Sequence, residues 1–422
     1  MLFGSSGIRR EFGPGLVDLA LRIGAAAADG ASNVVVGRDT RTTSELLEHS
    51  VIAGMLSAGA TVYTCGIAPT PTVAYATRDV DAGCMITASH NPESYNGVKL
   101  LNPDGSAFTR RQQAAIEGAL AKPHGKSWSE QGRVSPVDAV DTHREAILDQ
   151  LSLSKPVTVV LDCGNGAGSV ITPDLLTGAG ATVIGLNCNV FGRFARPSEP
   201  LEANLPYIRD IVRKREAACA VIHDGDADRM MAFDERGRYI DGDHLLMLFA
   251  KYLDRKHVVT TVDASMAIEE VAEVRRTPVG DSFVSEELLT WGDFGGEASG
   301  SWIFPEHSYC PDGIYAAGLL CEIASEWSIA EELDRMPRYT LLRESYRIAS
   351  PREVMVAIGA DEPTHGIRFD DDDGWYLIRA SGTEPKVRIT AEGKTPEKAK
   401  EMLSMGHTAL ERAKRDLGGE KE

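Results

Sequence analysis

The sequence lacks the features that mark membrane and secreted proteins. No stretch approaches the roughly 20 consecutive apolar residues of a transmembrane helix, and residues 1–7 lack the basic region and apolar core of a signal peptide. The 7 cysteines are an odd number and form no Cys-x-x-Cys pair, which argues against a disulfide framework and against a zinc site. We therefore expect a cytoplasmic protein without a membrane partner.

Positive charge is also scarce. The 44 lysines and arginines are outnumbered by 62 acidic residues, and the net charge of -18 argues against a nucleic-acid partner, because phosphate binding needs a basic face. An anionic ligand would need basic residues gathered locally in a cleft. Basic residues do flank the Gly- or Ser-rich loops, namely Arg9, Arg10, Lys99, Arg229, Arg379, Lys386 and Arg388.

Three parts of the chain share the pattern strand, polar loop, helix, strand. Residues 33–62 and 157–183 both end in Ala-Gly-Ala-Thr-Val, and residues 257–280 form a fainter copy with an expected helix over 267–274. This is the βαβ unit of a parallel sheet. A chain of 422 residues is long enough for about three domains.

The pattern changes after Met336. Short apolar segments at 346–348, 354–358, 375–379 and 386–392 predict strands, and a last helix is expected to begin at Pro396 after Thr395 as N-cap. This part predicts a smaller α+β domain.

A serine lies on a loop that leaves the predicted buried strand 82–86. Ser89 is followed by His90 and lies near Lys99, within Thr-Ala-Ser-His-Asn-Pro. Such a serine can attack a substrate or carry a phosphoryl group. The alternative interpretation is an ordinary surface turn rich in Ser and Asn.

Three carboxylates at alternate positions form the strongest single motif. Asp224, Asp226 and Asp228 can converge on one cation if the backbone loops, and Gly225 helps it to turn. Oxygen ligands favour magnesium or calcium over zinc. A bound Mg²⁺ leaves room for a phosphoryl group, whose charge Arg229 would help to stabilise.

An EF-hand is the competing interpretation of this motif, because Glu235 is the twelfth residue from Asp224. The sixth position is Arg229 instead of the required glycine. The flanks 218–222 and 230–233 are strand-like, so we reject the EF-hand.

Two further loops suit a phosphosugar. Residues 295–300, Gly-Gly-Glu-Ala-Ser-Gly, offer a carboxylate and a hydroxyl to sugar hydroxyls. Residues 379–386, Arg-Ala-Ser-Gly-Thr-Glu-Pro-Lys, follow a predicted strand and offer a guanidinium, two hydroxyls and backbone N–H groups to a phosphate.

Taken together and in this order, residues 87–99, 224–229, 295–300 and 379–385 resemble the motifs of the α-D-phosphohexomutase superfamily. Residues 3–9, at the start of the chain, and residues 37–41 also resemble segments of this superfamily. The resemblance implies an α/β protein with three similar mixed-sheet domains and a smaller α+β domain around a central cleft. The expected boundaries are 1–145, 146–245, 246–340 and 341–422.

The resemblance also implies the role of each loop. Ser89 would carry the catalytic phosphate and, with the three aspartates, ligate one Mg²⁺, while Lys99, His90 and Arg9 would line the reaction centre. Glu297 and Ser299 would bind sugar hydroxyls. The non-reacting phosphate would be held by Arg379, Ser381, Gly382 and Thr383. The partner would be a phosphosugar, and a hexose 1,6-bisphosphate would be the activator and intermediate.

Two positions depart from the superfamily. Many bacterial members have a histidine where this chain has Ser301, so its role in proton transfer would pass to Lys99 or to His307, or would not be needed. Arg10 stands where glycine is usual. Residues 300–307 resemble archaeal members that act on glucosamine phosphate, so we expect an isomerase that moves phosphate between O6 and O1 of that sugar. Mannose or glucose phosphate is the alternative, and a phosphatase or a non-catalytic sugar-phosphate sensor is a more remote one.

Overall fold

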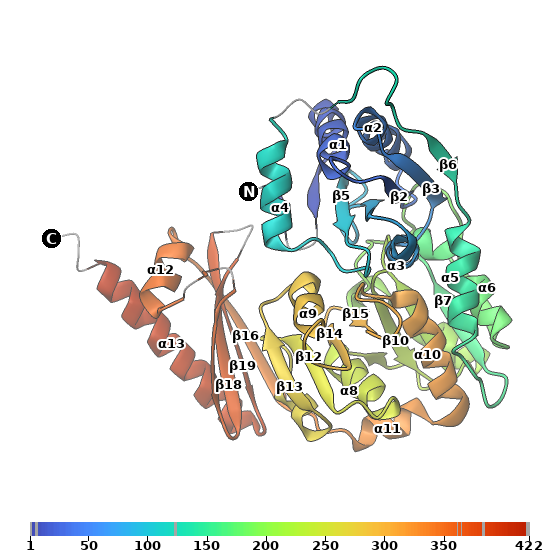
Figure 1. The fold of residues 1–422 in the computed structure, drawn as a ribbon. Helices are drawn as coiled ribbons and strands as arrows, with labels where there is room; N and C mark the ends of the chain where they lie inside the picture. Colours follow the sequence, from blue (N-terminus) through green and yellow to red (C-terminus); the bar gives the residue numbers. More distant parts are fainter. Residues whose placement is uncertain are drawn as a thin grey trace.

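The chain folds into four β-sheets that follow one another along the sequence (Figure 1). The computed structural model describes residues 2–4, 7–121, 125–360, 362–363, 365–381 and 385–418. The first three sheets mix parallel and antiparallel pairs, and the fourth is antiparallel throughout. The predicted α/β class is confirmed.

The first sheet has the order β1-β5-β4-β2-β3-β6. Alternate residues of the central strand β2 point to opposite faces of this sheet. Val34 and Val36 pack against helices α1, α2 and α4, whereas Val35 packs against helix α3. The strands are β1 (Ile8–Glu11), β2 (Asn33–Arg38), β3 (Thr61–Ile67), β4 (Ala82–Ile86), β5 (Tyr95–Leu101) and β6 (Val134–Pro136). The helices are α1 (Pro14–Ala27), α2 (Ser44–Ser57), α3 (Thr70–Ala76), α4 (Arg110–Ala119) and α5 (Ala139–Leu148).

The second and third sheets share one hydrophobic core. Phe249 lies edge-on to Phe294 and Trp302, and this group belongs to the same buried cluster as Val221 of the second sheet. The second sheet contains β7 (Thr158–Asp162), β8 (Thr182–Leu186), β9 (Cys219–His223), β10 (Met230–Asp234) and β11 (Tyr239–Ile240), with α6 (Thr172–Gly178) and α7 (Ile208–Arg215). The third contains β12 (His257–Thr261), β13 (Glu273–Thr277), β14 (Phe294–Glu297) and β15 (Ser301–Ile303), with α8 (Gly242–Tyr252), α9 (Asp281–Leu288), α10 (Gly313–Glu326) and α11 (Ile329–Arg335).

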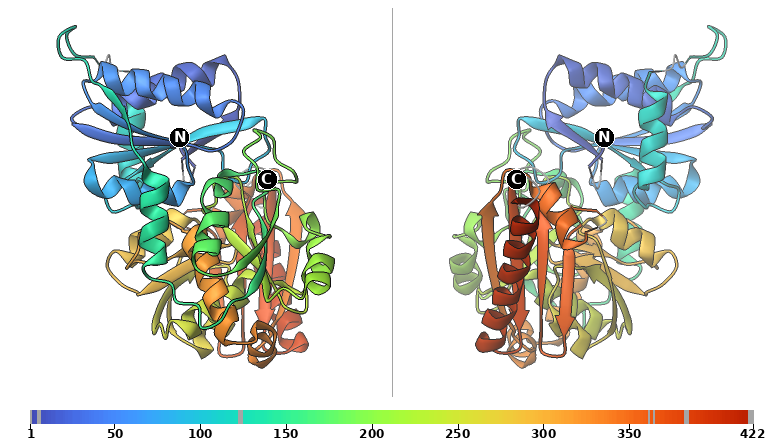
Figure 2. Two further views of the ribbon diagram at one scale, coloured as in Figure 1. Left: turned by 90° about the vertical axis from the view of Figure 1, so that its right-hand side faces the viewer. Right: turned by 90° about the vertical axis from the view of Figure 1, so that its left-hand side faces the viewer.

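The fourth sheet has its own core and lies beside the third (Figures 1 and 2). It is joined to the third by Arg368, which donates to the carbonyls of Val262 and Ala264 at 2.9 and 3.0 Å. Its elements are β16 (Thr340–Arg347), β17 (Ile367–Asp371), β18 (Gly374–Ala380) and β19 (Lys386–Gly393), with α12 (Pro351–Ile358) and α13 (Pro396–Gly418).

Two local predictions are wrong. The segment 354–358, expected as a strand, is the second half of α12, which begins with Pro351 at its first turn and buries Val354 and Met355. The helix expected over 267–274 is a 3-10 turn at Met266–Glu270 followed by β13. The expected start of the last helix is confirmed, because the Thr395 hydroxyl accepts the N–H of Lys398 at 3.2 Å.

No helix within the described ranges is long and apolar enough to cross a membrane.

Helices α1 and α2 cross with their backbones in contact, so small residues are required there. A Cβ added to Gly54 would lie 2.0 Å from the carbonyl oxygen of Leu21. We expect Gly54→Ala to lower the free energy of unfolding by about 1–3 kcal/mol, the range for overpacked cores. Gly118→Ala on α4 is the matched control, because its Cβ would meet no atom within 4 Å. Equal denaturant midpoints for the two variants would contradict this packing.

Candidate active site

The predicted serine and aspartate loops meet at the carboxyl edges of two sheets. Ser89 follows β4 of the first sheet, and Asp224 follows β9 of the second. The Ser89 hydroxyl donates to Asp224 Oδ2 at 2.9 Å. Such an edge is where ligands bind in α/β proteins, because loops after neighbouring parallel strands converge there.

The three aspartates of the second sheet converge as predicted. Asp224, Asp226 and Asp228 are buried, and one carboxylate oxygen from each lies within 4.8 Å of the others. Among the described side chains, Asp226 Oδ1 and Asp228 Oδ1 are buried without a hydrogen-bond partner. The loop is turned at Ala227, whose φ of 54° lies in the left-handed region. Orphaned carboxylate oxygens in an oxygen-only group suit a hard divalent cation.

Lys99 offsets part of this negative charge. Its Nζ donates to Asp226 Oδ2 at 2.8 Å and to Asp228 Oδ2 at 2.5 Å. Burial would lower the pKa of Lys99, but the two carboxylates outweigh burial and raise the pKa above its usual value. Burial and the charge of Asp226 raise the pKa of both Asp224 and Asp228. Their mutual repulsion would be relieved by a bound cation or by proton uptake.

Strand β10, which follows the aspartate loop, rules out the EF-hand. It begins at Met230, directly after the loop. Glu235, the residue that an EF-hand would turn toward the ion, accepts the N–H of Ala330 at 3.0 Å instead. The sequence-based rejection is confirmed.

The Ser89 loop is held by a buried ion pair that the sequence analysis did not identify as functional. Asp39 Oδ2 accepts Arg41 Nε at 3.0 Å and the Thr87 hydroxyl at 2.8 Å. The two Nη groups of Arg41 donate to four backbone carbonyls of the loop, with Ser89 at 2.7 Å. Ser89 has a φ of 49°, a strained conformation that such contacts can maintain. The sequence feature that could have identified this pair is Gly-Arg-Asp-Thr-Arg, at the end of a predicted buried strand.

His90 and Arg9 lie beside this loop. His90 Nδ1 is 3.3 Å from Ser89 Oγ, and burial followed by the charges of Arg229 and Arg9 lowers the pKa of His90 to about 2. The imidazole is therefore neutral. Arg9 Nη1 is 3.4 Å from Asn91 Oδ1.

The predicted sugar loop adjoins the aspartate loop. The N–H of Met230 donates to the carbonyl of Gly300 at 2.9 Å, and Arg229 forms a β-bridge with Ser301. Glu297 is buried and accepts the N–H of Gly280 at 2.9 Å, whereas Ser299 is exposed. Burial, with a further contribution from Asp281, raises the pKa of Glu297 from 4.5 to about 8.

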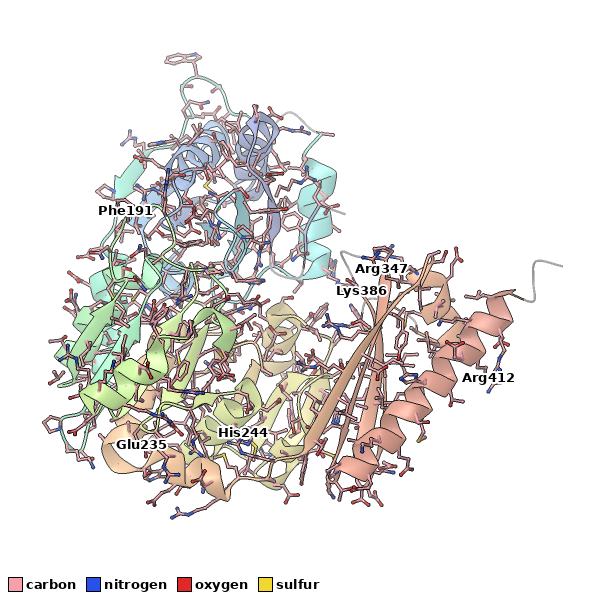
Figure 3. All side chains as sticks on the ribbon, turned by 180° about the vertical axis from the view of Figure 1, so that it is seen from behind. Phe191, Glu235, His244, Arg347, Lys386 and Arg412 are labelled. Atoms are coloured by element: carbon pink, nitrogen blue, oxygen red, sulfur yellow. The ribbon has the colours of Figure 1, made fainter. Side chains whose placement is uncertain are left out.

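The predicted phosphate loop belongs to the fourth sheet. Arg379 is the next-to-last residue of β18 and lies opposite Arg388, and the N–H of Ser381 donates to the carbonyl of Lys386 at 2.9 Å. Lys386 and Arg347 lie at the end of this sheet nearer the first sheet (Figure 3). The predicted residues Gly382 and Thr383 lie outside the described residues.

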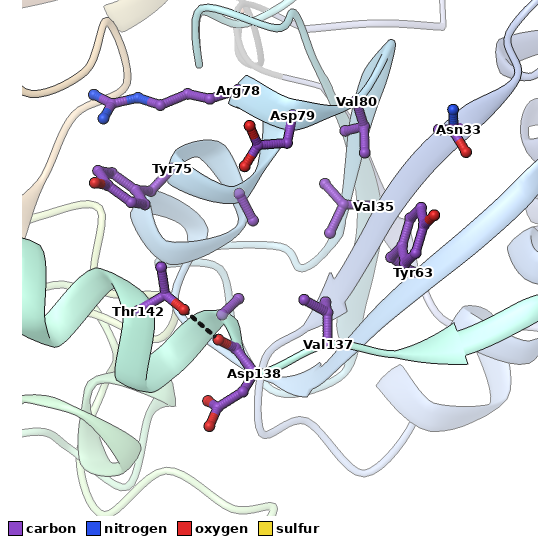
Figure 4. A pocket seen from close by; sticks show the side chains of 12 residues that line it. Asn33, Val35, Tyr63, Tyr75, Arg78, Asp79, Val80, Val137, Asp138 and Thr142 are labelled. Atoms are coloured by element: carbon purple, nitrogen blue, oxygen red, sulfur yellow. Dashed lines mark hydrogen bonds between the residues drawn. The ribbon is translucent and has the colours of Figure 1, made fainter.

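His307 is not at this site, so its predicted role as a substitute for the missing histidine is not supported. It is 1% exposed and is engaged with His143 and Asp312. A cavity of about 580 Å³ on the first sheet is also distinct, because none of the predicted site residues lines it (Figure 4).

A serine loop that meets a carboxylate cluster, on three mixed α/β sheets followed by an antiparallel fourth, defines an enzyme of the phosphohexomutase type. The chain belongs to the phosphoglucomutase/phosphomannomutase family, since it matches the models of the family's alpha/beta/alpha domains I, II and III at residues 1–125, 140–237 and 241–339, and of its C-terminal domain at 343–405. The finer boundaries predicted from the sequence stay a prediction.

Full-length relatives agree with the family assignment. The probable phosphoglucosamine mutase of Methanocella arvoryzae is 42% identical over 97% of this chain and 98% of its own length. The phosphoglucosamine mutase of Methanococcus aeolicus is 42% identical over 96% and 97%. Among solved structures, a phosphoglucomutase/phosphomannomutase family protein of Burkholderia thailandensis is similar with a TM-score of 0.88 and 26% identity, over 98% of this chain and 97% of that chain.

The Arg41 contacts predict that a lysine cannot replace this arginine. Lysine lacks the planar fork that reaches several carbonyls at once. We expect Arg41→Lys to lower turnover on the order of 10²-fold through displacement of Ser89. Arg22→Lys is the matched control, because Arg22 also donates to a backbone carbonyl, that of Leu120 at 2.7 Å, away from this loop. Turnover that falls equally in both variants would contradict a positioning role.

The raised pKa of Glu297 predicts a pH dependence of stability. Between pH 4.5 and about 8 the folded protein holds a proton that the unfolded chain has lost, so the free energy of unfolding falls as the pH rises. In Glu297→Gln this contribution is absent. We expect the variant to gain stability relative to the wild type by about 1 kcal/mol or more between pH 5 and pH 8. Denaturant unfolding at both pH values measures the gain, and a difference that does not change with pH would refute the assignment.

Proposed function

We propose that the chain interconverts glucosamine 6-phosphate and glucosamine 1-phosphate through a phosphoserine at Ser89. The observation that carries the proposal is the Ser89 hydroxyl, 2.9 Å from Asp224 in a buried carboxylate cluster that also contains Lys99. The full-length relatives named as phosphoglucosamine mutases support the choice of substrate. All seven cysteines are unpaired, which is consistent with a reducing cytoplasm.

The proposed metal is Mg²⁺, held by the three aspartates and by an oxygen on Ser89. The unpartnered oxygens Asp226 Oδ1 and Asp228 Oδ1 fit this ion, because Mg²⁺ binds to oxygen ligands. When bound, the ion would neutralise charge on the phosphoryl group.

The proposed reaction moves phosphate in two transfers. In the first, the bond from phosphorus to Ser89 Oγ breaks and a bond to sugar O1 forms, which gives a 1,6-bisphosphate. In the second, the bond to O6 breaks and the phosphoryl group returns to Ser89 Oγ. In each transfer the proton of the attacking hydroxyl ends on the oxygen that loses the phosphoryl group, and Lys99, a cation between Asp226 and Asp228, is the proposed group that gives one proton and takes up the other.

The remaining loops would orient the sugar. Glu297 and Ser299 are proposed to bind sugar hydroxyls, with Arg229 stabilising the transferred charge. Arg379 and Ser381, with Gly382 and Thr383 outside the described residues, are proposed to hold the other phosphate. Since the bisphosphate must turn over between transfers, the fourth sheet would open and close during each cycle.

The Ser89 role predicts a covalent phosphate. We expect Ser89→Ala to lose turnover, on the order of 10³-fold or more, while it still binds the phosphosugar. Intact-mass measurement of the wild type, after incubation with a hexose 1,6-bisphosphate, should show one added phosphate that maps to Ser89. A wild type that isomerises without this phosphate, or a variant with unchanged turnover, would overturn the mechanism.

Substrate choice is tested by the rates on glucosamine, mannose and glucose 6-phosphates, measured side by side with excess Mg²⁺. The highest kcat/KM is expected for glucosamine 6-phosphate. A higher value for mannose or glucose phosphate would replace the proposed substrate but keep the mutase. Release of inorganic phosphate without isomerisation would identify a phosphatase, and binding without either product would identify a sensor.

A further inference from the structure

A second group of metal-binding side chains lies behind the aspartate loop. His143 lies on α5, His307 lies in the loop after β15, and Asp312 directly precedes α10. All three are buried, with exposed fractions of 0%, 1% and 1%. The phosphohexomutase reaction proposed above uses none of them.

The three donor atoms form a compact triangle. His143 Nε2 and His307 Nε2 are 3.1 Å apart, and Asp312 Oδ2 lies 3.1 Å from the first and 3.4 Å from the second. Zinc bound tetrahedrally at its usual bond lengths of about 2.0–2.1 Å separates its ligands by about 3.3 Å. The triangle therefore has the dimensions of a tetrahedral site. Two imidazoles and one carboxylate are also a ligand set that zinc prefers.

The outer nitrogen of each imidazole has a partner that suits metal binding. Zinc at Nε2 requires the proton on Nδ1, which then needs an acceptor. Thr72 Oγ1 lies 3.0 Å from His143 Nδ1. The side-chain amide nitrogen of Gln150 lies 3.2 Å from His307 Nδ1 and also donates to the carbonyl of Ala146 at 3.2 Å. Zinc at His307 Nε2 therefore requires Gln150 to give up that bond and to present its oxygen instead. Burial lowers the pKa of His143, which favours the neutral imidazole that a metal requires.

Hydrogen bonds and a stacked aromatic ring hold the triangle in place. Asp312 Oδ1 accepts the N–H groups of Ile314 and Tyr315 at 2.9 Å, which leaves Oδ2 directed at the histidines. The Tyr75 ring stacks on His143 and His307 at 5.0 and 5.4 Å between ring centroids. Tyr75 also lines the cavity of Figure 4, together with Ala139 and Thr142 of the helix that carries His143.

From this geometry we infer that His143, His307 and Asp312 bind one zinc ion. Three protein ligands leave the fourth position of the ion to water. The cysteine pattern predicts that the chain has no zinc site, but that prediction considers thiolate ligands, and this site needs no sulfur.

The ion would join parts of the chain that support the aspartate loop. Helix α3, which carries Thr72 and Tyr75, begins at Thr70, whose hydroxyl donates to Asp226 Oδ2 at 2.5 Å. The N-terminus of α10 also packs on that loop, because a Cβ on Gly313 would lie 2.7 Å from the carbonyl oxygen of Ala227. Zinc would thus connect α5, which packs on α3, to the N-terminus of α10.

The first test is the metal content of the full chain without an affinity tag. The protein is given one equivalent of Zn²⁺, dialysed against excess Mg²⁺ to occupy the aspartates, and measured by mass spectrometry for elements. We expect about one zinc per chain in the wild type, and its loss in His307→Gln and His143→Gln. The matched control is His244→Gln on α8 (labelled in Figure 3), because His244 is also buried and bonded to a carboxylate, that of Asp241. This control should keep its zinc.

Two results would overturn the inference. One is a wild type that retains no zinc after this treatment, and the other is equal zinc retention in His307→Gln and the control.

The second test needs no variant, so it holds even if the substitutions prevent folding. Titration of the wild type with Co²⁺ under the same Mg²⁺ excess should give the intense visible absorption of a tetrahedral site, removed by one equivalent of Zn²⁺. Weak absorption typical of octahedral Co²⁺, or a thiolate charge-transfer band, would show that the metal binds elsewhere and would overturn the inference.

Discussion

The structure depends on placing three buried carboxylates next to one another. Asp224, Asp226 and Asp228 are buried and repel each other. The loop that carries them is stable only if cations and hydrogen-bond donors surround it. Lys99 from the first sheet supplies one cation. Ion pairs of Lys99 therefore join the first and second sheets at this point. The Ser89 hydroxyl also contacts this cluster, through its hydrogen bond to Asp224.

Backbone contacts then determine where Ser89 lies. The loop around Ser89 has no regular secondary structure of its own, so its carbonyls need donors from elsewhere. Arg41 provides these donors, and Asp39 both neutralises Arg41 and orients Thr87. A strained serine backbone is maintained in this way by a pair of buried residues. Arginine suits this task because its guanidinium presents five N–H groups in a fixed plane.

The sequence was most informative where chemistry is local and least informative where contacts are distant. The Asp-x-Asp-x-Asp spacing and the Ser89 loop could be predicted because each motif follows an apolar strand, and loops after parallel strands share an edge. The role of Arg41 was missed, since its acceptors lie about fifty residues away in the chain. The short apolar segment 354–358 predicts a strand, but Pro351 at the first turn and the packing of Met355 in the fourth core favour a helix.

The common core of the second and third sheets has a consequence for the energy landscape of the chain. A cooperative unfolding unit is delimited by its buried contacts, and the contacts of Phe249 and α10 do not stop at the boundary between these two sheets. We therefore expect the two sheets to unfold as one unit and the fourth sheet, with a separate core, to unfold as another. On this view the fourth sheet would open without disrupting the carboxylate loop.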